Sequence, residues 1–588
     1  MTLLASDAPA EAAPATTQPL VAVRDLEVTF PGQPPVEAVR GLSFDIFPGR
    51  VTALVGESGS GKSVTARTLV GLAGDHARVG ATRFQVAGAN ALTLSERRWR
   101  RLRGGRIGFV FQDALTSLDP LRTVAREVSE PLRVHGSTPR RERLDRVYQL
   151  LADVGVPDPE IRAHQYAHQL SGGLRQRALI ASALAANPEL LIVDEPTTAL
   201  DVTVQAQILE LLSERVRLGT ALLIISHDLA VVSQLADQII VLREGVAVEE
   251  GPTEQVLTRP GHLYTKRLLE AVPSQASRGR RLSNVEVDAA AAARLAGSAP
   301  RTAPGHTASG GGGEVPVLAA QGIGKTFPMP GGGRRRAVVD VSLEVFPGDR
   351  VGVVGESGSG KSTLARLLLG LETPDSGRSL VHGQPWNAGD KAERVRRRHS
   401  VQFISQDPIG SFDPRYTVRQ VIAEPLRGRP LDGARGANRP GGEAGERAAE
   451  LAALVGLEPE LLSRSPKTLS GGQAQRVAIA RALALRPAVV VCDEPVSALD
   501  VSIQAQILDL LDELNRATGT ALVFISHDLG VVHHLVDRVL VMTNGHVVES
   551  GHVEDVFTHP LHPYTKSLIA AIPRLPGAAF QAPDTIAK

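Results

Sequence analysis

Short apolar runs recur along the chain, and each of them ends in glycine or in polar residues. Val51–Val55 and Val351–Val354 are rich in valine and lead into glycine loops, and the residues from Lys62 onward read as a helix. Continuous apolar runs of four or five residues are typical of strands that are covered on both faces. The pattern therefore predicts strand–loop–helix alternation around a buried parallel sheet.

Four further apolar runs extend this predicted sheet. Asp-Glu follows two of these runs, Leu190–Val193 and Val489–Cys492. Ser-His-Asp follows the other two, Ala221–Ile225 and Ala521–Ile525. Ligands of parallel α/β sheets bind at the carboxyl ends of the strands. We therefore expect these polar motifs to converge at one edge of a sheet.

The polar motifs occur twice at a nearly constant spacing. The spacing is 299 residues for the glycine-loop lysines (361 − 62), the Ser-Gly-Gly serines (470 − 171) and the Asp-Glu aspartates (493 − 194). It is 300 residues for the Ser-His-Asp histidines (527 − 227) and the Tyr-Thr-Lys tyrosines (564 − 264), and 294 for two glutamines (406 − 112). Two identical eight-residue glycine loops do not arise by chance, so the chain is one domain duplicated and fused.

The repeat and the local composition set the expected domain boundaries. Ala289–Ala293 and Gly310–Gly313 lie in a stretch that cannot bury a core, and about 40 residues of such coil span roughly 35 Å, enough for the halves to pair. Each half also carries a predicted helical insertion, over 117–167 and 411–467. We expect a disordered tail over 1–18, nucleotide-binding domains over 19–273 and 315–575, a flexible linker over 274–314, and a C-terminal tail over 576–588.

Composition excludes several classes of protein. The 588 residues carry a formal net charge of +1, which gives no electrostatic signal for nucleic acid. The arginine runs 97–101 and 394–398 read as solvated helix faces. Cys492 is the only cysteine, which excludes a disulfide framework, a cysteine zinc site and a cysteine-ligated iron–sulfur cluster. No apolar run reaches the ~20 residues needed to span a bilayer, so a membrane role requires a partner.

Each glycine loop fits the phosphate-binding pattern G-x-x-x-x-G-K-[ST]. Its glycines allow backbone N–H groups to point at phosphate oxygens, and the following helix adds the positive end of its dipole. We expect Lys62 and Lys361 to contact the β- and γ-phosphates, and Ser63 and Ser362 to ligate Mg²⁺. The other expected contacts are Gly56, Ser58, Gly59, Gly61 and Val64 in the first half, and Gly355, Ser357, Gly358, Gly360 and Thr363 in the second.

The residues that follow the other strands supply the expected chemistry. Asp194 and Asp493 are placed to hold the metal, and Glu195 and Glu494, on the other side of an extended chain, to polarise an attacking water. A neutral amide can bond both a metal-bound oxygen and a water, so Gln112 and Gln406 are expected to sense nucleotide and to contact the metal. His227 and His527 are expected to contact the γ-phosphate. An isolated glutamine or histidine would read as a surface or packing residue; repetition of each motif favours function.

Three further features complete this part of the sequence. Ser171-Gly172-Gly173 and Ser470-Gly471-Gly472-Gln473 place a hydroxyl and glycine N–H groups at a helix start, which is a second anion-binding surface. It is best explained as serving the other half of the chain. Cys492 reads as a small buried apolar residue. His533 and His534 fall within a helix, and we assign them no function.

Taken together, these motifs resemble the ATP-binding cassette superfamily over both halves, about 21–273 and 317–573. The order matches: glycine loop, Gln loop, Leu-Ser-Gly-Gly, Asp-Glu-Pro, Ala-Leu-Asp (Asp201, Asp500) and His loop. The resemblance implies two α/β P-loop cassettes, each with a mainly parallel RecA-like sheet, an antiparallel β subdomain and a helical subdomain. It also implies head-to-tail pairing, in which Ser470 and Gly472 complete the first ATP–Mg²⁺ site and Ser171 and Gly173 the second. Phe30 and Phe327 occupy the place where an aromatic ring stacks on adenine.

The Tyr-Thr-Lys ends resemble a narrower group, the peptide/nickel-type importer ATPases. This implies an ATP-hydrolysing subunit on the cytoplasmic face of the inner membrane. Because both halves retain the glutamate, Glu195 and Glu494, we expect both sites to hydrolyse ATP. Its implied partners are two permeases and an extracytoplasmic binding protein, and its implied cargo is di- or oligopeptides. Nickel chelates, glutathione or opine-like metallophores stay open as cargo. A soluble tandem-cassette factor acting on ribosomes or DNA is the alternative; the Ala/Gly-rich linker and the lack of zinc cysteines argue against it.

Overall fold

The computed structural model describes residues 18–112, 117–136, 138–197, 200–283, 315–329, 333–426, 443–497, 499–573 and 575. It divides into two compact units, Met1–Thr197 with Gln207–Thr265, and Thr198–Ala206 with Lys266–Lys588. Residues 1–17, 284–314 and 576–588, which include most of both expected tails and most of the expected linker, lie outside the described part.

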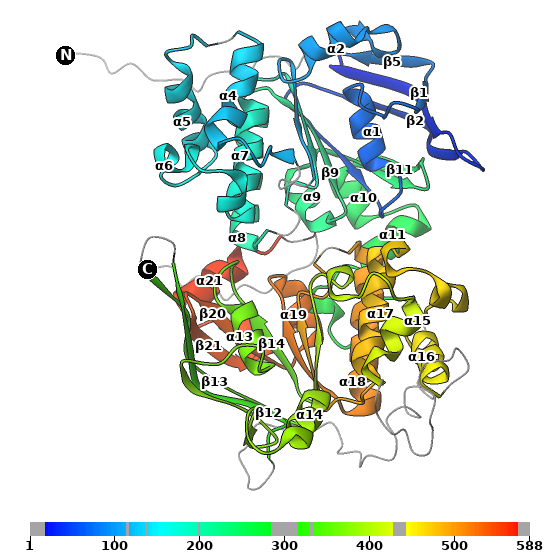
Figure 1. The fold of residues 1–588 in the computed structure, drawn as a ribbon. Coiled ribbons are helices and arrows are strands. Elements are labelled where there is room, and N and C mark those ends of the chain that lie inside the picture. Colours follow the sequence, from blue (N-terminus) through cyan, green and yellow to red (C-terminus); the bar gives the residue numbers. More distant parts are fainter. Residues whose placement is uncertain are drawn as a thin grey trace, which may run out of the picture. The chain divides into compact units, whose positions relative to one another are not determined.

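A six-stranded sheet forms the centre of the first unit (Figure 1). Its order is β11-β10-β3-β9-β8-β7, and every neighbouring pair is parallel except β10 with β11. Every residue of β3, β8 and β9 is buried, which explains why these strands are apolar except for Thr52 and the terminal Asp194 and Ser226. The bounds are β3 Val51–Val55, β7 Ile107–Val110, β8 Leu190–Asp194, β9 Ala221–Ser226, β10 Gln238–Arg243 and β11 Val246–Pro252.

A second, antiparallel sheet in this unit has the order β2-β1-β5-β6, with β4 also paired to β1. Its inward residues join the same hydrophobic core as β3, β8 and β9. The bounds are β1 Val21–Phe30, β2 Val36–Ile46, β4 Arg78–Gly80, β5 Arg83–Val86 and β6 Ala89–Asn90.

Helices of the first half of the chain make up the rest of the first unit, except that the start of α8 and most of α11 belong to the second unit. Figure 1 shows α4, α5, α6 and α7 grouped together as a helical lobe, which confirms the predicted helical insertion. The bounds are α1 Lys62–Leu69, α2 Glu96–Leu102, α4 Val124–Val134, α5 Arg143–Asp153, α6 Pro159–Ala163, α7 Gly172–Leu184, α8 Val202–Arg217, α9 Leu229–Leu235, α10 Thr253–Thr258 and α11 Leu263–Glu270.

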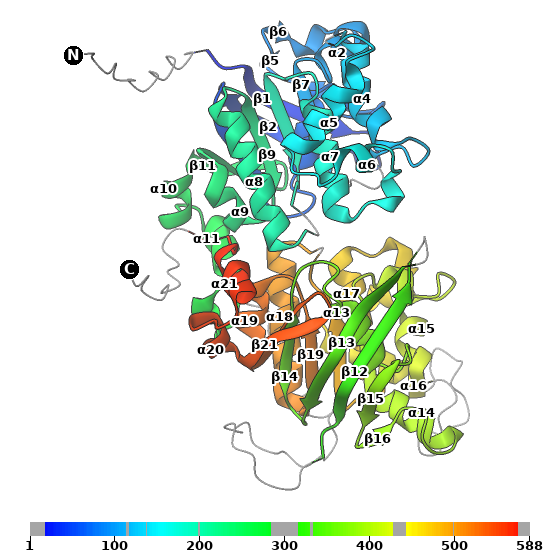
Figure 2. The same ribbon diagram turned by 90° about the vertical axis from the view of Figure 1, so that its left-hand side faces the viewer.

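The second unit repeats this architecture. Its main sheet has the order β17-β18-β19-β14-β20-β21, again parallel except for the last pair. Its antiparallel sheet has the order β13-β12-β15-β16, visible side by side in Figure 2. The bounds are β12 Leu318–Pro328, β13 Arg334–Val345, β14 Arg350–Val354, β15 Ser376–Val381, β16 Gln384–Pro385, β17 Val401–Ile404, β18 Val489–Asp493, β19 Ala521–Ile525, β20 Arg538–Thr543 and β21 His546–His552.

The helices of the second unit follow in the same order as those of the first. They are α13 Lys361–Leu368, α14 Lys391–Ser400, α15 Val418–Ala423, α16 Glu443–Leu454, α17 Gly471–Leu483, α18 Val501–Thr518, α19 Leu529–Leu535, α20 Val553–Thr558 and α21 Pro563–Ala570. The fold class expected from the sequence, two α/β cassettes with mainly parallel sheets, is therefore confirmed.

One segment differs from expectation. Residues 274–283 were expected to open a flexible linker, but they belong to the second unit and contact it. Gln275–Ser277 form a short 3-10 helix, and Leu282 is buried in the same hydrophobic cluster as residues of α18 and α19. Composition could not show this, because the segment is held by a few specific side chains and not by a long apolar run.

Candidate nucleotide-binding and hydrolysis sites

The first glycine loop connects β3 to α1 and wraps around the ammonium group of Lys62. Lys62 is the first residue of α1 and is buried; its Nζ donates to the carbonyl oxygens of Gly56 and Glu57 at 2.7 and 2.8 Å. A Cβ on Gly56 would lie 2.2 Å from the carbonyl oxygen of Leu242, at φ +150°. Glycine is therefore required there so that the loop can pass the end of β10.

The second glycine loop has the same geometry. Lys361 Nζ donates to the carbonyl oxygens of Gly355 and Glu356 at 2.7 and 2.9 Å. Burial lowers the pKa of Lys361, although the nearby carboxylates oppose this shift. In both loops the residues at the tip, Ser58-Gly59 and Ser357-Gly358, are exposed, and the Ser357 N–H donates to Asp201 Oδ2 at 3.4 Å.

A serine and an aspartate meet beside each lysine. Ser63 Oγ donates to Asp194 Oδ1 at 3.1 Å, and Ser362 Oγ donates to Asp493 Oδ1 at 3.3 Å. Burial raises the pKa of both aspartates, and the serine hydrogen bond offsets only part of that shift. A nearby cation would favour their charged form.

These oxygen donors fit Mg²⁺, which prefers hard oxygen ligands and usually keeps few protein ligands beside substrate phosphates. The described residues contain no group of three or more His, Cys, Asp or Glu that could hold a metal without further ligands.

A glutamate and a histidine pair at the ends of the two neighbouring strands. His227 Nδ1 lies 2.6 Å from Glu195 Oε2 in the first unit, and His527 Nδ1 lies 3.1 Å from Glu494 Oε1 in the second. Burial alone would raise the pKa of Glu494, but the hydrogen bond and charge of His527 outweigh it, and the pKa is lowered.

The backbone at these glutamates corrects one expectation. The sequence suggested an extended chain that alternates Asp and Glu between two faces. Instead the strands end at the aspartates, and the glutamates have φ of +53° at Glu195 and +48° at Glu494. Each glutamate N–H donates to the last part of the neighbouring strand, Ile225 or Ile525, at 2.9 Å. The turn is strained for glutamate and directs its carboxylate toward the histidine.

The two glutamines behave differently. Gln406 Nε2 donates to Glu494 Oε2 at 3.1 Å, which joins the second Gln loop to the Glu–His pair. Gln112 is exposed after β7, and the following residues 113–116 lie outside the described part. A direct contact of either glutamine with a metal stays a prediction.

The Ser-Gly-Gly motifs begin α7 and α17, as predicted. Ser171 Oγ accepts from Leu174 N–H at 3.4 Å, and Ser470 Oγ accepts from Gln473 N–H at 3.3 Å. Only in the second unit does a side chain at that third position, Gln473, accept from the serine N–H, at 3.0 Å. The two motifs are alike as helix starts, but only the second has a complete capping box.

The remaining predicted contacts are at the edges of each site. Phe30 ends β1 half-buried, and Lys325 Nζ lies 5.6 Å from the centre of the Phe327 ring. Val64 and Thr363 lie in the first turns of α1 and α13. Stacking of either phenylalanine on adenine stays a prediction.

Two tyrosines near the sites had no function assigned from the sequence. The Tyr264 hydroxyl accepts from Glu57 N–H at 3.2 Å, and the Tyr564 hydroxyl accepts from Glu356 N–H at 3.0 Å. Burial raises the pKa of both hydroxyls, so they stay protonated at neutral pH. The recurrence of Tyr-Thr-Lys in both halves was the signal that could have pointed to these contacts with the glycine loops.

The duplicated Lys, Ser, Asp, Glu and His constellation has a clear counterpart among known proteins. Residues 39–198 and 338–497 both match the family described as "ABC transporter". The chain belongs to the ABC transporter family. Residues 248–327 and 548–584 match "Oligopeptide/dipeptide transporter, C-terminal region". The chain is therefore a tandem ATP-binding-cassette ATPase of this group.

Curated relatives match this chain over nearly its whole length. The chain is 42% identical to "Glutathione import ATP-binding protein GsiA" of Escherichia coli (strain K12) over 573 residues, which cover 94% of this chain and 89% of that protein. The namesake protein of Shigella sonnei (strain Ss046) gives the same values. A solved complex of an archaeal ribosomal stalk protein and a ribosome recycling factor matches with a TM-score of 0.55, 20% identity and 88% coverage of this chain, 87% of that one. That likeness shows the fold alone.

Among the described residues, the helices are all too short or too polar to cross a membrane.

Proposed function

We propose that this ATPase hydrolyses ATP at two sites, one on each glycine loop, and thereby energises uptake of short peptides. The lysine of each loop neutralises phosphate charge, and the loop N–H groups orient the nucleotide. Glu195 and Glu494 polarise the attacking water, and His227 and His527 hold these carboxylates and contact the γ-phosphate. Mg²⁺, held by Ser63 with Asp194 and by Ser362 with Asp493, supplies neutralisation of phosphate charge when bound.

The observation that carries this proposal is the duplicated Glu–His pair. In each unit a strained glutamate at a strand end lies within 3.1 Å of a histidine at the next strand end. The pair stands beside a lysine and a serine–aspartate contact that suit a nucleotide and its cation. Strained residues persist where the surrounding structure over-determines them, and such positions cluster at active sites.

We further propose that the cassettes pair head to tail, so that each Ser-Gly-Gly helix start completes the other site. Two observations support it. At both helix starts the serine and the first glycine are exposed and suit an anion, whereas Gly472 is buried. In addition, Asp201 accepts a hydrogen bond from Ser357 N–H at 3.4 Å within the second unit. Asp201 follows the Asp-Glu-Pro motif of the first half, whereas Ser357 belongs to the glycine loop of the second.

For transport, the ATPase would act with two permeases and an extracytoplasmic binding protein, on the cytoplasmic face of the membrane. The C-terminal regions of both halves match an oligopeptide/dipeptide transporter family, and the relatives named above are glutathione import proteins. Glutathione is itself a tripeptide, so both findings point to small peptides as the cargo. We propose short peptides, with glutathione as the first candidate to test.

The hydrolysis proposal is tested by Glu195→Gln and Glu494→Gln, made singly and together in the assembled transporter. Each change keeps the volume of the side chain and removes its charge. We expect each single variant to lose ATPase activity on the order of 10²-fold or more, because a water-positioning carboxylate is lost. Glu244→Gln is the matched control, because Glu244 is exposed and has the same left-handed backbone, φ +49°. Full activity of either single variant would refute the equal participation of both sites.

The cargo is tested with an extracytoplasmic binding protein sought among the genes next to that of this ATPase. Its affinity for glutathione, a dipeptide and a nickel chelate is measured by calorimetry, and uptake of the labelled ligand is followed in cells carrying active or doubly Glu→Gln-substituted ATPase. We expect a peptide to bind and its uptake to need the active ATPase. Preferred binding of the nickel chelate would overturn the peptide assignment and leave the hydrolysis proposal intact.

A further inference from the structure

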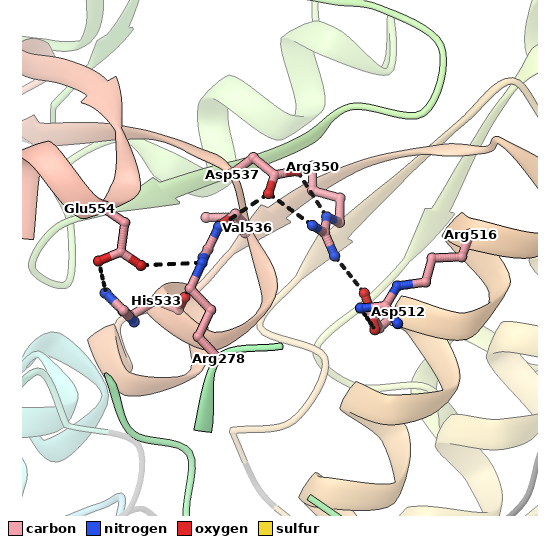
Figure 3. A network of polar contacts seen from close by, with 8 residues as sticks. All are labelled: Arg278, Arg350, Asp512, Arg516, His533, Val536, Asp537 and Glu554. Carbon is pink, nitrogen blue, oxygen red and sulfur yellow. Dashed lines mark hydrogen bonds and ion pairs between the residues drawn. The ribbon is translucent and has the colours of Figure 1, made fainter. Parts of the chain in front are cut away.

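The segment 274–283, which we call the strap, follows α11 of the first cassette and lies on the second cassette (Figure 3). It contacts α18, α19, α20 and the start of β20. Its attachment uses side chains that the proposed ATPase mechanism does not involve. The contacts of the strap therefore serve a purpose other than ATP hydrolysis.

Arg278 is the centre of the attachment. Its Nη1 donates to the carbonyl oxygens of His533 and Val536, both at 2.6 Å. The guanidinium group therefore caps the C-terminal end of α19. Its Nη2 donates to Asp537 Oδ1 at 3.1 Å, and its Nε lies 3.3 Å from Glu554 Oε1. One guanidinium thus satisfies two helix carbonyls and two carboxylates, and only 23% of the side chain is exposed.

A second attachment point lies five residues further along. Asp509 of α18 accepts from Leu282 N–H at 3.0 Å and from Ser283 N–H at 2.7 Å. The Ser283 hydroxyl donates to the same carboxylate at 2.6 Å. Leu282 is 6% exposed and packs in the main hydrophobic cluster of the second unit. The strap is thus held by buried apolar surface and by two separate sets of charge-assisted hydrogen bonds.

Two weaker contacts lie between these points. Ser277 Oγ is 3.0 Å from His534 Nδ1, and Arg281 Nη2 donates to Glu513 Oε2 at 2.7 Å. His533 Nε2 lies 3.2 Å from Glu554 Oε2 and so fixes the carboxylate that also meets Arg278. The two adjacent histidines, which had no function from the sequence, therefore belong to the surface that receives the strap.

The duplicated chain provides an internal comparison. At offsets of 299 and 300 residues the positions of Asp509, His533, His534 and Arg350 are Glu210, Ser233, Gln234 and Val51 in the first cassette. The position of Arg278 is Ala578 after the second cassette. The strap and several residues of its docking surface thus occur together, once per chain, and not as a shared property of both halves.

Figure 3 shows how the docking surface is itself supported. Arg350, where the first cassette has valine, donates to Asp537 through Nε at 2.9 Å and Nη2 at 2.8 Å, and it also bonds Asp512. Arg516 holds the other oxygen of Asp512 at 2.8 Å. Asp537 therefore lies between Arg278 and Arg350, which neutralise its charge from two sides.

From these observations we propose that the strap is an intramolecular anchor that keeps the first cassette attached close to the second when no nucleotide is bound. A docked strap shortens the stretch of chain that joins the two cassettes, because the chain is then fixed at Arg278, eight residues after the end of α11 at Glu270, and not first at β12. The effective concentration of two linked modules rises as the chain between them becomes shorter, so docking raises it.

The anchor is tested without ATP, so its failure is distinguishable from failure of the proposed hydrolysis. A protease recognition sequence is placed between residues 300 and 310, and the full chain is cut once in the presence of EDTA. Size-exclusion chromatography then shows whether the two pieces elute together. We expect the cut wild-type chain to stay as one species at micromolar concentration.

Arg278→Glu reverses the central charge and should separate the cut pieces, with association weakened at least about tenfold, as expected for loss of one charge-assisted hydrogen bond. Arg280→Glu is the matched control, because Arg280 is exposed and lies in the same segment, and its only hydrogen bond among the described residues is that of its backbone N–H to the Ser277 carbonyl oxygen, which the substitution keeps. Asp509→Asn tests the second attachment from the other partner. Uncut Arg278→Glu chain should also need more ATP for half-maximal hydrolysis, because the effective concentration of the first cassette near the second falls.

A competition experiment keeps the test valid even if a variant misfolds. A synthetic peptide of residues 273–284 is added in excess to the cut wild-type chain, and the same peptide with Arg278→Glu serves as control. We expect the native peptide to release the first piece and the control peptide to have no effect. Separation of the cut wild-type pieces without peptide would overturn the proposal. So would pieces that stay together in Arg278→Glu chain and in the presence of native peptide.

Discussion

The contact of Tyr264 with the first glycine loop leads to a sharp prediction. Tyr264→Phe removes only the hydroxyl that accepts the Glu57 N–H hydrogen bond of 3.2 Å. The phenyl ring stays, and so does its contact with the Arg243 guanidinium, whose carbon lies 5.2 Å from the ring centre. Because Glu57 N–H lies in the loop that is expected to bind phosphate, the loss should act on nucleotide binding more than on folding.

The magnitude follows from the kind of bond that is lost. A hydrogen bond between a neutral hydroxyl and a backbone N–H contributes roughly 0.5–1.5 kcal/mol. If that free energy holds the loop in its binding conformation, the ATP dissociation constant should rise by about 2- to 13-fold at that site. Tyr564→Phe should have the same effect at the second loop, where the distance is 3.0 Å. The double variant should weaken both sites by the same factors, because the two hydroxyls contact different loops.

The assay is titration with a fluorescent ATP analogue, together with thermal unfolding. Tyr148→Phe is the matched control, because the exposed Tyr148 hydroxyl contacts His164 at 3.3 Å in the helical lobe. That variant should leave ATP affinity unchanged. ATP affinity within a factor of two of wild type in the Tyr264/Tyr564 double variant would refute the reasoning. Equal loss of affinity in the Tyr148 variant would show that the effect is not specific to the loops.

Three other outcomes can be checked directly. Gly56→Ala should lower the free energy of unfolding by on the order of 1–3 kcal/mol and abolish ATP binding, because its Cβ would lie 2.2 Å from a backbone oxygen. Gly59→Ala should lower it by only about 1 kcal/mol, because its Cβ would meet nothing within 4 Å. Unfolding in urea measures both values. Burial lowers the pKa of His533 below its unfolded value of about 6.5, although Glu554 nearby opposes this shift. The folded state therefore binds fewer protons than the unfolded state, and stability is lost as the pH falls below ~6.5. Between pH 7 and 5.5 the melting temperature of His533→Gln should fall less than that of the wild-type chain. Cys492 is fully buried, so iodoacetamide should label it only after denaturation, and labelling of the native chain would contradict the packing described.

Much of the fold follows from local sequence. The runs around Val51, Leu190 and Ala221 are almost entirely apolar, with Thr52 as the exception inside Val51–Val55, and all of them are buried strands. Strands of this kind are stable in a parallel sheet that helices cover on both faces. Because the offset between the halves is nearly constant, the same strands are expected in the second cassette. Membership in the ABC transporter family adds the order of the motifs, which the sequence also contained in full.

Parts of the candidate site could not be read in this way. The left-handed backbone of Glu195 depends on where the neighbouring strand offers a carbonyl, at Ile225, which lies thirty residues later. The contact of Tyr264 with Glu57 joins residues about two hundred positions apart. Such contacts are set by tertiary packing and leave no periodic pattern. Only the recurrence of the same residue in both halves marks them.

The strap shows the opposite case, in which a difference between the halves is informative. Residues that both cassettes keep, such as Asp237 and Asp537, serve the shared fold: Asp237 accepts from Val51 N–H at 2.7 Å in the first cassette. In the second cassette the same aspartate bonds Arg350 and Arg278, two arginines that have no counterparts in the first. The Asp537 side chain is 39% exposed, and the side chains of Arg278 and Arg350 are 23% and 21% exposed, so these contacts are partly shielded from water. A shared aspartate with new, well-placed cationic partners in one copy therefore marks where that copy acquired an additional attachment.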